Sequence, residues 1–297
     1  APFGAVQIGP NNINKGWDWC SGYHYSDSIV IGFSHLHLNG TGCSDTGDIL
    51  FMPYTGKART QPGTQQDPLA GYASYYSKDN ERALPGYYEV LLKTHRTKVE
   101  LTASDRVAFH RYTFPKDVEK HVMINLKDAN GDDRPTDTYL EQINDTVIRG
   151  YRYSTGWSKK QQIYFSAVFS QPVHLTLYHD SVQVAGNRLQ GLDVKGNVAV
   201  APVVEELGVK VGISPVSMEN AMDNIGQEIK DWNFENIVAE TTGKWNAELS
   251  KLQVETTDTV AKRIFYTALY HAFMQPIMFN DCSGEYRGTD KNIYGDP

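Results

Sequence analysis

The sequence predicts a β-rich chain of several domains: an amino-terminal antiparallel β-sandwich, a helical linker, and then the start of an (α/α) helical barrel. Three observations support this fold class. Before Pro215, short segments that alternate apolar and polar residues recur roughly every 8–12 residues, as in sandwich proteins. No helical pattern separates these segments, which argues against a parallel α/β sheet. After Pro215, apolar residues recur at helical spacing.

The predicted strands follow one another from the amino terminus to about residue 214. Tyr87–His95 and Lys98–Ala103 show the clearest alternation of apolar and polar residues, the pattern of a half-buried strand. Asn and Gly at Ala185-Gly186-Asn187 predict a turn, because both residues adopt positive φ at low cost. Further strands are predicted at Arg106–Phe114, His121–Leu126, Val147–Tyr153, Gln162–Phe169, Val173–Tyr178, Val198–Val204 and Gly208–Ile213.

The first helices are predicted just after the sandwich. Ser217 can cap a helix, since its hydroxyl can accept a hydrogen bond from a free backbone N–H of the first turn. Asn233–Leu252 has the pattern of two short amphipathic helices interrupted at Gly243. This region therefore predicts a helical linker.

A stronger helix is predicted near the end of the sequence. It begins at Thr257 or Asp258, which can cap it, and ends before Pro276. Its apolar residues cover most faces, so we expect neighbours on several sides. The predicted domains are therefore residues 1–215 for the sandwich, 216–256 for the linker and 257–297 for the beginning of the barrel, with the remainder of the barrel expected outside this chain.

Composition excludes several classes of partner. The chain has 297 residues and a formal net charge of −7 without a Lys/Arg-rich run, which argues against nucleic-acid binding. No run of apolar residues is long enough to span a membrane. Of the three cysteines, Cys20 and Cys43 can pair in an oxidising compartment or remain two unpaired thiols; Cys282 has no further partner.

The stretch Gly16–Pro53 combines aromatic rings with histidines and aspartates. This chemistry suits a sugar, whose C–H face stacks on rings while polar side chains bond its hydroxyls. Trp17 and Trp19 would share one face if the segment is extended, and either could instead fill the core. His35 and His37 have the spacing of half a zinc site, but a hydrogen-bonded histidine pair at a domain interface is the simpler interpretation.

Several motifs in this stretch resemble glycoside hydrolase family 92, the calcium-dependent exo-α-mannosidases. They read GWDWCSGYHYSD, GFSHLHLNGTG and GDILFMP, and the likeness resumes at RIFYTALYHAFMQPIMFNDCSGEYRG. The resemblance implies a sandwich, a helical linker and an (α/α) toroid that carries the catalytic carboxylates. It also implies inverting, calcium-assisted removal of terminal α-linked mannose, with α-1,2 as the expected linkage, by a secreted or periplasmic enzyme.

The resemblance further implies a set of sugar-binding residues. Asp281 and Cys282 are expected to contact the terminal mannose, and Trp17 and Trp19 to form the rim of the site. On the sequence alone, the segment around Asp281 reads as a polar turn held by glycines. Because the resemblance places the acid, the base and most calcium ligands beyond Pro297, no catalytic residue or metal ligand is predicted here.

The expected partners are therefore a mannose-containing glycan and the carboxy-terminal helical domain of the same polypeptide. This chain alone is expected to be inactive. We also expect substitution of Asp281 to impair sugar binding and to leave thermal stability nearly unchanged.

Two other functions fit parts of the sequence. A lectin-like carbohydrate-binding sandwich would explain the aromatic residues but would leave the helical tail without a purpose. A sugar mutarotase or epimerase would need a His/Glu pair among the strands, for which Glu89, Glu100, His95 and His110 are available without a motif that selects them.

Overall fold

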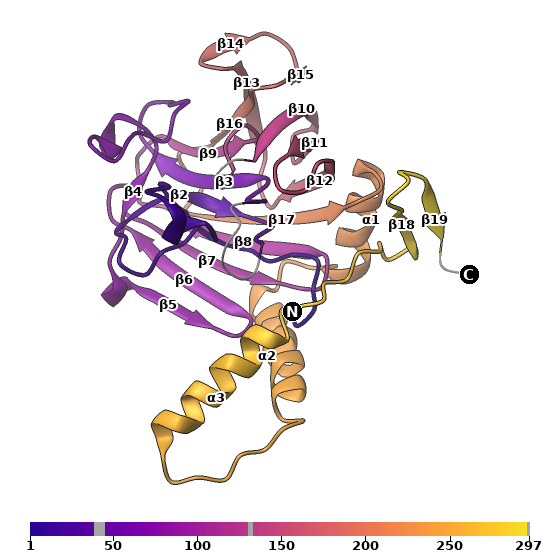
Figure 1. Cartoon of the computed structure of the whole chain (residues 1–297). Coiled ribbons are helices and arrows are strands. Elements are labelled where there is room, and N and C mark those ends of the chain that lie inside the picture. The colour runs from indigo at the N-terminus through magenta and orange to yellow at the C-terminus, as the bar shows by residue number, and fades with distance from the viewer. Residues whose placement is uncertain (39–44, 130–132, 296–297) are drawn as a thin grey trace.

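The computed structural model describes residues 1–38, 45–129 and 133–295. Two antiparallel sheets face each other and form a β-sandwich, from which two helices project (Figure 1). In the described part, one sheet contains eight strands, in the order β1 (Gly9–Asn12), β2 (Ile29–Ser34), β3 (Leu50–Thr55), β9 (Lys120–Asn125), β16 (Val194–Val200), β13 (Val173–His179) and β14 (Val182–Val184), with β4 (Ser74–Tyr75) paired to β2.

The second sheet contains nine strands in the described part of the chain. Their order is β15 (Arg188–Gly191), β10 (Arg134–Asn144), β11 (Val147–Thr155), β12 (Gln161–Phe169), β17 (Glu206–Ser214), β8 (Val107–Thr113), β7 (Thr97–Ala103), β6 (Tyr87–Leu92) and β5 (Glu81–Leu84). A small hairpin, β18 (Glu285–Arg287) with β19 (Ile293–Gly295), lies beside this sandwich. The antiparallel β-rich fold class is therefore confirmed.

The strand predictions fail where the alternation of apolar and polar residues fails. The strand expected at Val198–Val204 is β16, which begins and ends four residues earlier, at Val194–Val200. Several of the described strands were not predicted, among them β3 and β10. All residues of β3 except the last are buried, so β3 shows no alternation. Polar residues dominate both ends of β10, where they hide the period of two.

The core lies between the sheets and contains a histidine contact that the sequence did not predict. His35, next to β2, places Nε2 2.9 Å from Nε2 of His110 on β8. His37 instead bonds Ser34 Oγ and the Gln7 carbonyl oxygen. The expectation of a His35–His37 pair at a domain interface is therefore wrong. Burial lowers the pKa of His35 to about 4, so this ring is neutral in the core.

Helix α1 (Met218–Glu228) begins as predicted, because Ser217 Oγ accepts a hydrogen bond from Asn220 N at 3.0 Å. It packs across β17, β12 and β11, on the outer face of the nine-stranded sheet. The short 3-10 turns η1 (Trp17–Trp19), η2 (Pro68–Ala70) and η3 (Lys78–Asn80) lie in loops of the sandwich. Thus α1 is the helix that joins the sheet to the segments that follow.

Helix α2 (Phe234–Leu249) corrects the predicted break at Gly243, because it is continuous through that residue. An interior glycine costs only about 1 kcal/mol relative to alanine. Contacts on either side of Gly243 offset that loss: Thr241 donates to the Ala103 carbonyl at 2.8 Å, and Trp245 is buried. Tertiary packing therefore overrides the local preference.

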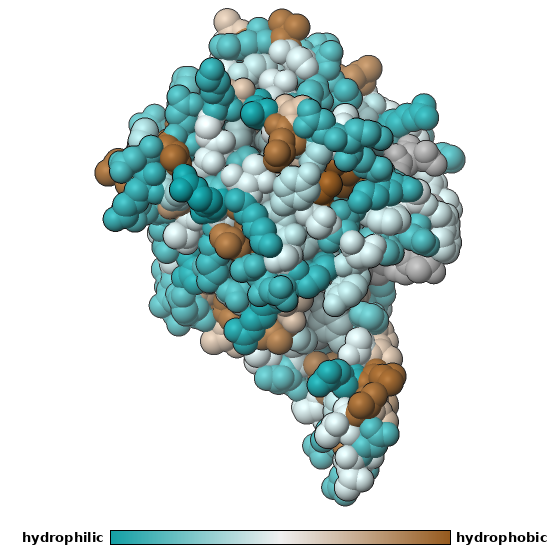
Figure 2. Space-filling view, turned by 90° about the vertical axis from the view of Figure 1, so that its left-hand side faces the viewer, coloured by the Kyte–Doolittle hydropathy of each residue, from teal (hydrophilic) through white to brown (hydrophobic). Residues whose placement is uncertain are grey.

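Helix α3 (Thr259–Ala272) begins at the predicted cap, Asp258, whose Oδ1 accepts from Val260 N and Ala261 N. None of its residues is buried, and Val260 and Ile264 are 65% and 64% exposed. Figure 2 shows apolar residues gathered on this projecting arm, whereas those on the sandwich face are scattered. None of the described helices is long and apolar enough to span a membrane.

One buried ionic cluster connects the two sheets of the sandwich. Arg152 on β11 is fully buried and donates through Nη1 to both Asp48 and Asp133, and through Nε to the Leu126 carbonyl oxygen. One guanidinium therefore faces two carboxylates, and Asp48 Oδ2 and Asp133 Oδ1 have no hydrogen-bond partner in the described part. Burial raises the pKa of Asp133 to about 6, against the attraction of Arg152.

The raised pKa of Asp133 predicts a stability that declines with pH. The folded protein holds this proton more tightly than the unfolded chain, whose pKa is 3.8. The resulting stabilisation is complete below that value and is lost as pH rises through about 6. Asp133→Asn stays neutral and can still accept from Arg152. Urea titrations give the free energy of unfolding of the variant minus that of wild type at each pH. This difference should be about 1–3 kcal/mol higher at pH 8 than at pH 4.

The control for this measurement is Asp145→Asn, which changes an exposed carboxylate at the β10–β11 turn. Its difference from wild type should not change with pH. An equally flat curve for Asp133→Asn would show that Asp133 remains ionised in the folded protein.

Candidate functional site

The segment after α3 runs back along the sandwich and lies beside the N-terminal residues (Figure 1). Phe3 N donates to the Phe273 carbonyl oxygen at 3.1 Å, and Met278 N donates to the Phe3 carbonyl oxygen at 2.8 Å. The rings of Phe3 and Phe273 are 5.6 Å apart. These contacts direct the next residues, which include Asp281, between the nine-stranded sheet and α1.

Asp281 is 1% exposed and accepts hydrogen bonds from three side chains. Its Oδ2 accepts from Ser214 Oγ at 2.6 Å and from Asn220 Nδ2 at 3.0 Å, and its Oδ1 accepts from Asn224 Nδ2 at 2.8 Å. The sequence alone suggested a polar turn held by glycines, but the structure has a carboxylate fixed by β17 and α1. We therefore expect Asp281 to contribute to stability as well, unlike the expectation from the sequence.

Three polar residues of α1 face this segment at intervals of four: Asn220, Asn224 and Glu228. Residues four apart lie on one face of a helix, and the neighbouring residues Ala221 and Ile225 are buried against the sheet. Sequence reasoning missed this polar stripe. The signal was available as two parallel four-residue patterns, one polar and one apolar, in MENAMDNIGQE.

Cys282 lies against an ion pair between Arg106 and Glu228, whose charged atoms are 2.8 Å apart. Its Sγ is 3.4 Å from Glu228 Oε1, and Arg106 Nη1 points at the sulfur from 3.7 Å. The pKa of Cys282 is raised to about 11, mainly by partial burial of the sulfur and secondly by the negative charge of Glu228. The residue is a neutral thiol at physiological pH, which fits a small wall and not a nucleophile.

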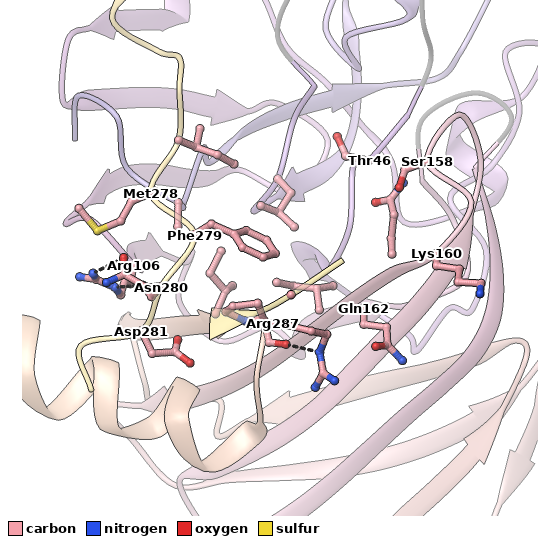
Figure 3. A pocket seen from close by; sticks show the side chains of 18 of the residues that line it. Thr46, Arg106, Ser158, Lys160, Gln162, Met278, Phe279, Asn280, Asp281 and Arg287 are labelled. Atoms are coloured by element: carbon pink, nitrogen blue, oxygen red, sulfur yellow. Dashed lines mark hydrogen bonds between the residues drawn. The ribbon is translucent and has the colours of Figure 1, made fainter. Parts of the chain in front are cut away.

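A cavity of about 370 Å³ opens beside Asp281. Phe279, 55% exposed, points into its middle, with Gln162, Lys160 and Arg287 along one side (Figure 3). The apolar part of the lining is Ala5, Leu36, Ile163, Ile213, Pro215, Ile277, Met278 and Phe279. Such a combination of apolar wall and hydrogen-bonding rim suits a sugar.

Arg287 is held at this rim by the short connection between β17 and α1. Its Nε donates to the Pro215 carbonyl oxygen at 2.8 Å, and its Nη2 donates to the Val216 carbonyl oxygen at 3.0 Å. Asp281 is the one carboxylate among the described residues that line the cavity. The cavity can therefore bind and orient a polar ring, but its described lining does not contain the pair of carboxyl groups that glycoside hydrolysis uses.

The two tryptophans occupy the turn η1 and not an extended segment, so the expectation that they share one face is wrong. Trp17 is 63% exposed. The Trp19 ring stacks on His24 at 4.2 Å, and its Nε1 donates to Asp27 Oδ2 at 2.9 Å. Neither residue lines the cavity beside Asp281. The structure therefore brings Asp281 to the cavity and leaves Cys282 and the tryptophans outside its lining.

Among the described residues, no group of three or more His, Cys, Asp or Glu side chains is arranged to hold a metal ion. These residues do not fit a calcium site, and we assign no metal ligand. Cys20 is buried, while Cys43 lies outside the described residues, as does the possible pairing of the two.

The two histidines considered for an epimerase do not contact the two glutamates. Glu100 bonds Arg111, His110 is in the core, and His95 bonds the Tyr72 carbonyl oxygen. Glu89 pairs with Lys98. The described contacts therefore give no His/Glu pair to support an epimerase.

Comparison with known proteins adds the following findings. Residues 1–214 match the glycosyl hydrolase family 92 N-terminal domain, and residues 220–296 match the glycosyl hydrolase family 92 catalytic domain. A relative named uncharacterized secreted glycosidase, from Arthroderma benhamiae, is 23% identical over 304 residues, which are 89% of this chain and 37% of that protein.

Two solved structures are similar over the whole chain. The family GH92 alpha-mannosidase of Bacteroides thetaiotaomicron, solved in complex with mannoimidazole, is 34% identical with a TM-score of 0.94, covering 100% of this chain and 40% of that chain. The family GH92 glycosyl hydrolase ccman5 is 28% identical with a TM-score of 0.89, covering 99% and 41%. The chain thus spans about two fifths of the length of these relatives.

The raised pKa of Cys282 predicts slow alkylation. At pH 8 a thiol with a pKa of about 11 is ionised in about one molecule in a thousand, and the thiolate is the reactive form. Iodoacetamide should therefore modify Cys282 at least ~100-fold more slowly than an unstructured peptide thiol, measured by peptide mass spectrometry. Glu228→Gln should accelerate the reaction, because it removes the nearby negative charge.

Asp223→Asn, an exposed change on the same helix, is the matched control and should leave the rate unchanged. A wild-type rate equal to that of the peptide would contradict the assigned environment of the thiol.

Proposed function

The chain belongs to glycosyl hydrolase family 92, and we propose that it forms the sandwich, linker and first barrel helix of an enzyme that removes terminal α-linked mannose from glycans. The observation that carries the proposal is that the match to the family's catalytic domain covers Asp281 and the part of the cavity lining between Ile277 and Lys291. The alpha-mannosidase of Bacteroides thetaiotaomicron is similar over the whole chain. We propose α-1,2 as the linkage that is cut.

In this proposal Asp281 accepts a hydrogen bond from the terminal mannose. A carboxylate offers about four acceptor sites, of which protein donors use three. Oδ1 accepts one of these bonds and retains capacity for a sugar hydroxyl, and Asp281 is part of the cavity wall. A charge-assisted hydrogen bond is about twice as strong as a neutral one, so a single contact can be decisive for binding.

Cys282 and the tryptophans complete the proposed sugar-binding set. Cys282 would form a small neutral wall next to the ring of the terminal mannose. Trp17 has an exposed ring that could stack on the next sugar of the glycan, whereas one face of Trp19 is covered by His24. Trp19 would then act at the rim mainly by supporting this turn.

We propose that hydrolysis is inverting and that its acid and base belong to the larger remainder of the family proteins, beyond the region this chain matches. Calcium dependence is part of the proposal on the basis of the family resemblance, and no residue of this chain is assigned to the ion. The mature enzyme would act outside the cytoplasm, as a secreted or periplasmic protein; the curated relative carries the name of a secreted glycosidase.

The proposed domains are residues 1–215, 216–256 and 257–297, with the last continuing into a carboxy-terminal helical domain of the same polypeptide. A lectin-like sandwich without catalysis is the alternative. It is less favoured, because residues 220–296 match a catalytic domain. The two differ in whether the full-length protein releases mannose from a disaccharide.

Asp281→Asn in the full-length enzyme should lower kcat/KM for an aryl α-mannoside by at least ~100-fold, since a sugar hydroxyl would face an amide in a closed pocket. It should also lower Tm, because the carboxylate accepts three protein hydrogen bonds. Steady-state kinetics at a temperature where the variant is fully folded separates the two effects.

Ser214→Ala is the matched control, because it removes one donor to Asp281 and keeps the carboxylate. It should lower Tm while reducing kcat/KM less than tenfold, since the capacity of Oδ1 is untouched. Equal losses of kcat/KM in both variants would mean that Asp281 only supports the fold.

The 297-residue chain by itself should release no mannose, because the described lining of its cavity contains one carboxylate and the reaction needs two. The full-length protein should release free mannose, lose activity in EDTA and regain it with calcium. Mannose release is measured by anion-exchange chromatography. Turnover by the fragment would refute the division of roles, and full activity in EDTA would refute calcium dependence.

A further inference from the structure

Asn224, in the middle of α1, contacts both residues of the Asp281–Cys282 step. Its Nδ2 donates to Asp281 Oδ1 at 2.8 Å and to the Ile213 carbonyl oxygen at 3.0 Å. Its Oδ1 accepts from Cys282 N at 2.8 Å. The side chain is fully buried. Because the amide has a donor end and an acceptor end, only one orientation satisfies all three partners.

Asn220 and Glu228, the other two residues of the polar stripe on α1, help to hold the same segment. Asn220 Nδ2 donates to Asp281 Oδ2 and to Glu285 Oε2. Glu228 pairs with Arg106, whose Nε donates to the Asn280 carbonyl oxygen. The segment is therefore fixed along one face of α1 (Figure 3).

The helix that carries these residues is itself fixed against β17. A Cβ added at Gly212 would lie 2.1 Å from the Ala221 carbonyl oxygen and 2.8 Å from Ile225 Cγ1. Only a glycine on the strand permits this approach. Because α1 packs directly against the backbone of β17, the helix cannot shift to compensate for a changed side chain at position 224.

We propose that Asn224 is a positioning residue for the reaction: it orients the Asp281 carboxylate and the Cys282 backbone toward the terminal mannose without touching the sugar. The inference rests on the proposed function of Asp281 and Cys282. It adds a residue on a different element, and it explains why two of the three side-chain donors to Asp281 lie on α1. Asn224 leaves the outer part of Oδ1 for the sugar and prevents rotation of the carboxylate.

Asn224→Asp tests this role with almost no change of shape. An ionised aspartate can accept from Cys282 N but cannot donate to Asp281, and two carboxylates then face each other in a buried site. A protonated aspartate can donate again, as the amide does. The charged groups around this position are Asp281 and Glu285 on the C-terminal segment and Glu228 on α1, with Arg106 beyond Glu228.

The experiment measures kcat/KM of the full-length enzyme from pH 5 to pH 8, per mole of folded protein. At pH 8, Asn224→Asp should be about 30- to 1,000-fold below wild type, the loss expected when a buried charged group loses its donor. The ratio of variant to wild type should rise at least ~10-fold on going from pH 8 to pH 5, since protonation restores the donor. A packing defect alone would give a ratio that does not depend on pH.

Asn236→Asp, the same substitution at an exposed position of α2, is the matched control and should follow wild type at every pH. If Asn224→Asp does not fold at pH 8, Asn220→Asp decides, because it removes a donor to the same carboxylate from a partly exposed position. Its ratio to wild type should rise in the same direction with falling pH. A pH-independent ratio, or wild-type kcat/KM at pH 8, overturns the proposal.

Failure of this inference is distinguishable from failure of the proposed function. If Asp281→Asn abolishes activity while Asn224→Asp has normal kcat/KM at pH 8, Asp281 grips the sugar and Asn224 does not position it. If Asp281→Asn retains normal kcat/KM, the sugar site itself is assigned wrongly, whatever the Asn224 variant does.

Discussion

The burial of one carboxylate, Asp281, determines how the last part of the chain is arranged. A buried anion is tolerated only where donors surround it, and here the donors come from Ser214 at the end of β17 and from Asn220 and Asn224 on α1. The two carboxylate oxygen atoms of Asp281 therefore connect the sandwich, α1 and the C-terminal segment. The capping of α1 by Ser217 belongs to the same connection, because it fixes where the helix begins relative to β17. The hydrogen bonds to Asp281 therefore act together with apolar contacts, such as those of Ala221 and Ile225 with the sheet, to place the elements of the candidate site.

The fold was predictable because many of its strands, such as β11 and β13, are half-buried, which gives their sequences a period of two. The prediction failed at β3, buried along almost its whole length, and at β10, polar at both ends, since neither shows that period. The predicted helix break at Gly243 was wrong because Thr241 and Trp245 anchor α2 on the sandwich. The periodicity of apolar residues indicates that one face of a helix or strand is buried. It does not indicate which distant segments contact that face.

The candidate site was only partly predictable, for the same reason. Asp281 and Cys282 were singled out by a resemblance, but their surroundings depend on pairings across about 60 residues of sequence, such as Asn224 with Asp281. A polar residue on a helix normally faces water, so Asn224 gave no signal by itself. Trp17 and Trp19 were misjudged because a short 3-10 turn has no distinctive pattern, and the assumption of an extended segment set their directions wrongly.

The distribution of charge around the cavity decides which part of the proposed chemistry this chain can supply. Hydrolysis with inversion needs one carboxyl group that gives a proton and another that activates water, on opposite sides of the bond. The described lining contains cationic and amide groups, an aromatic ring at Phe279 and the single carboxylate of Asp281, already bonded to three donors. A carboxylate so engaged suits the recognition of a hydroxyl, because its geometry is fixed before the sugar arrives. The contribution of this chain to the proposed reaction is therefore to hold the terminal sugar still, while the proton transfers are made by groups that approach from outside this cavity wall.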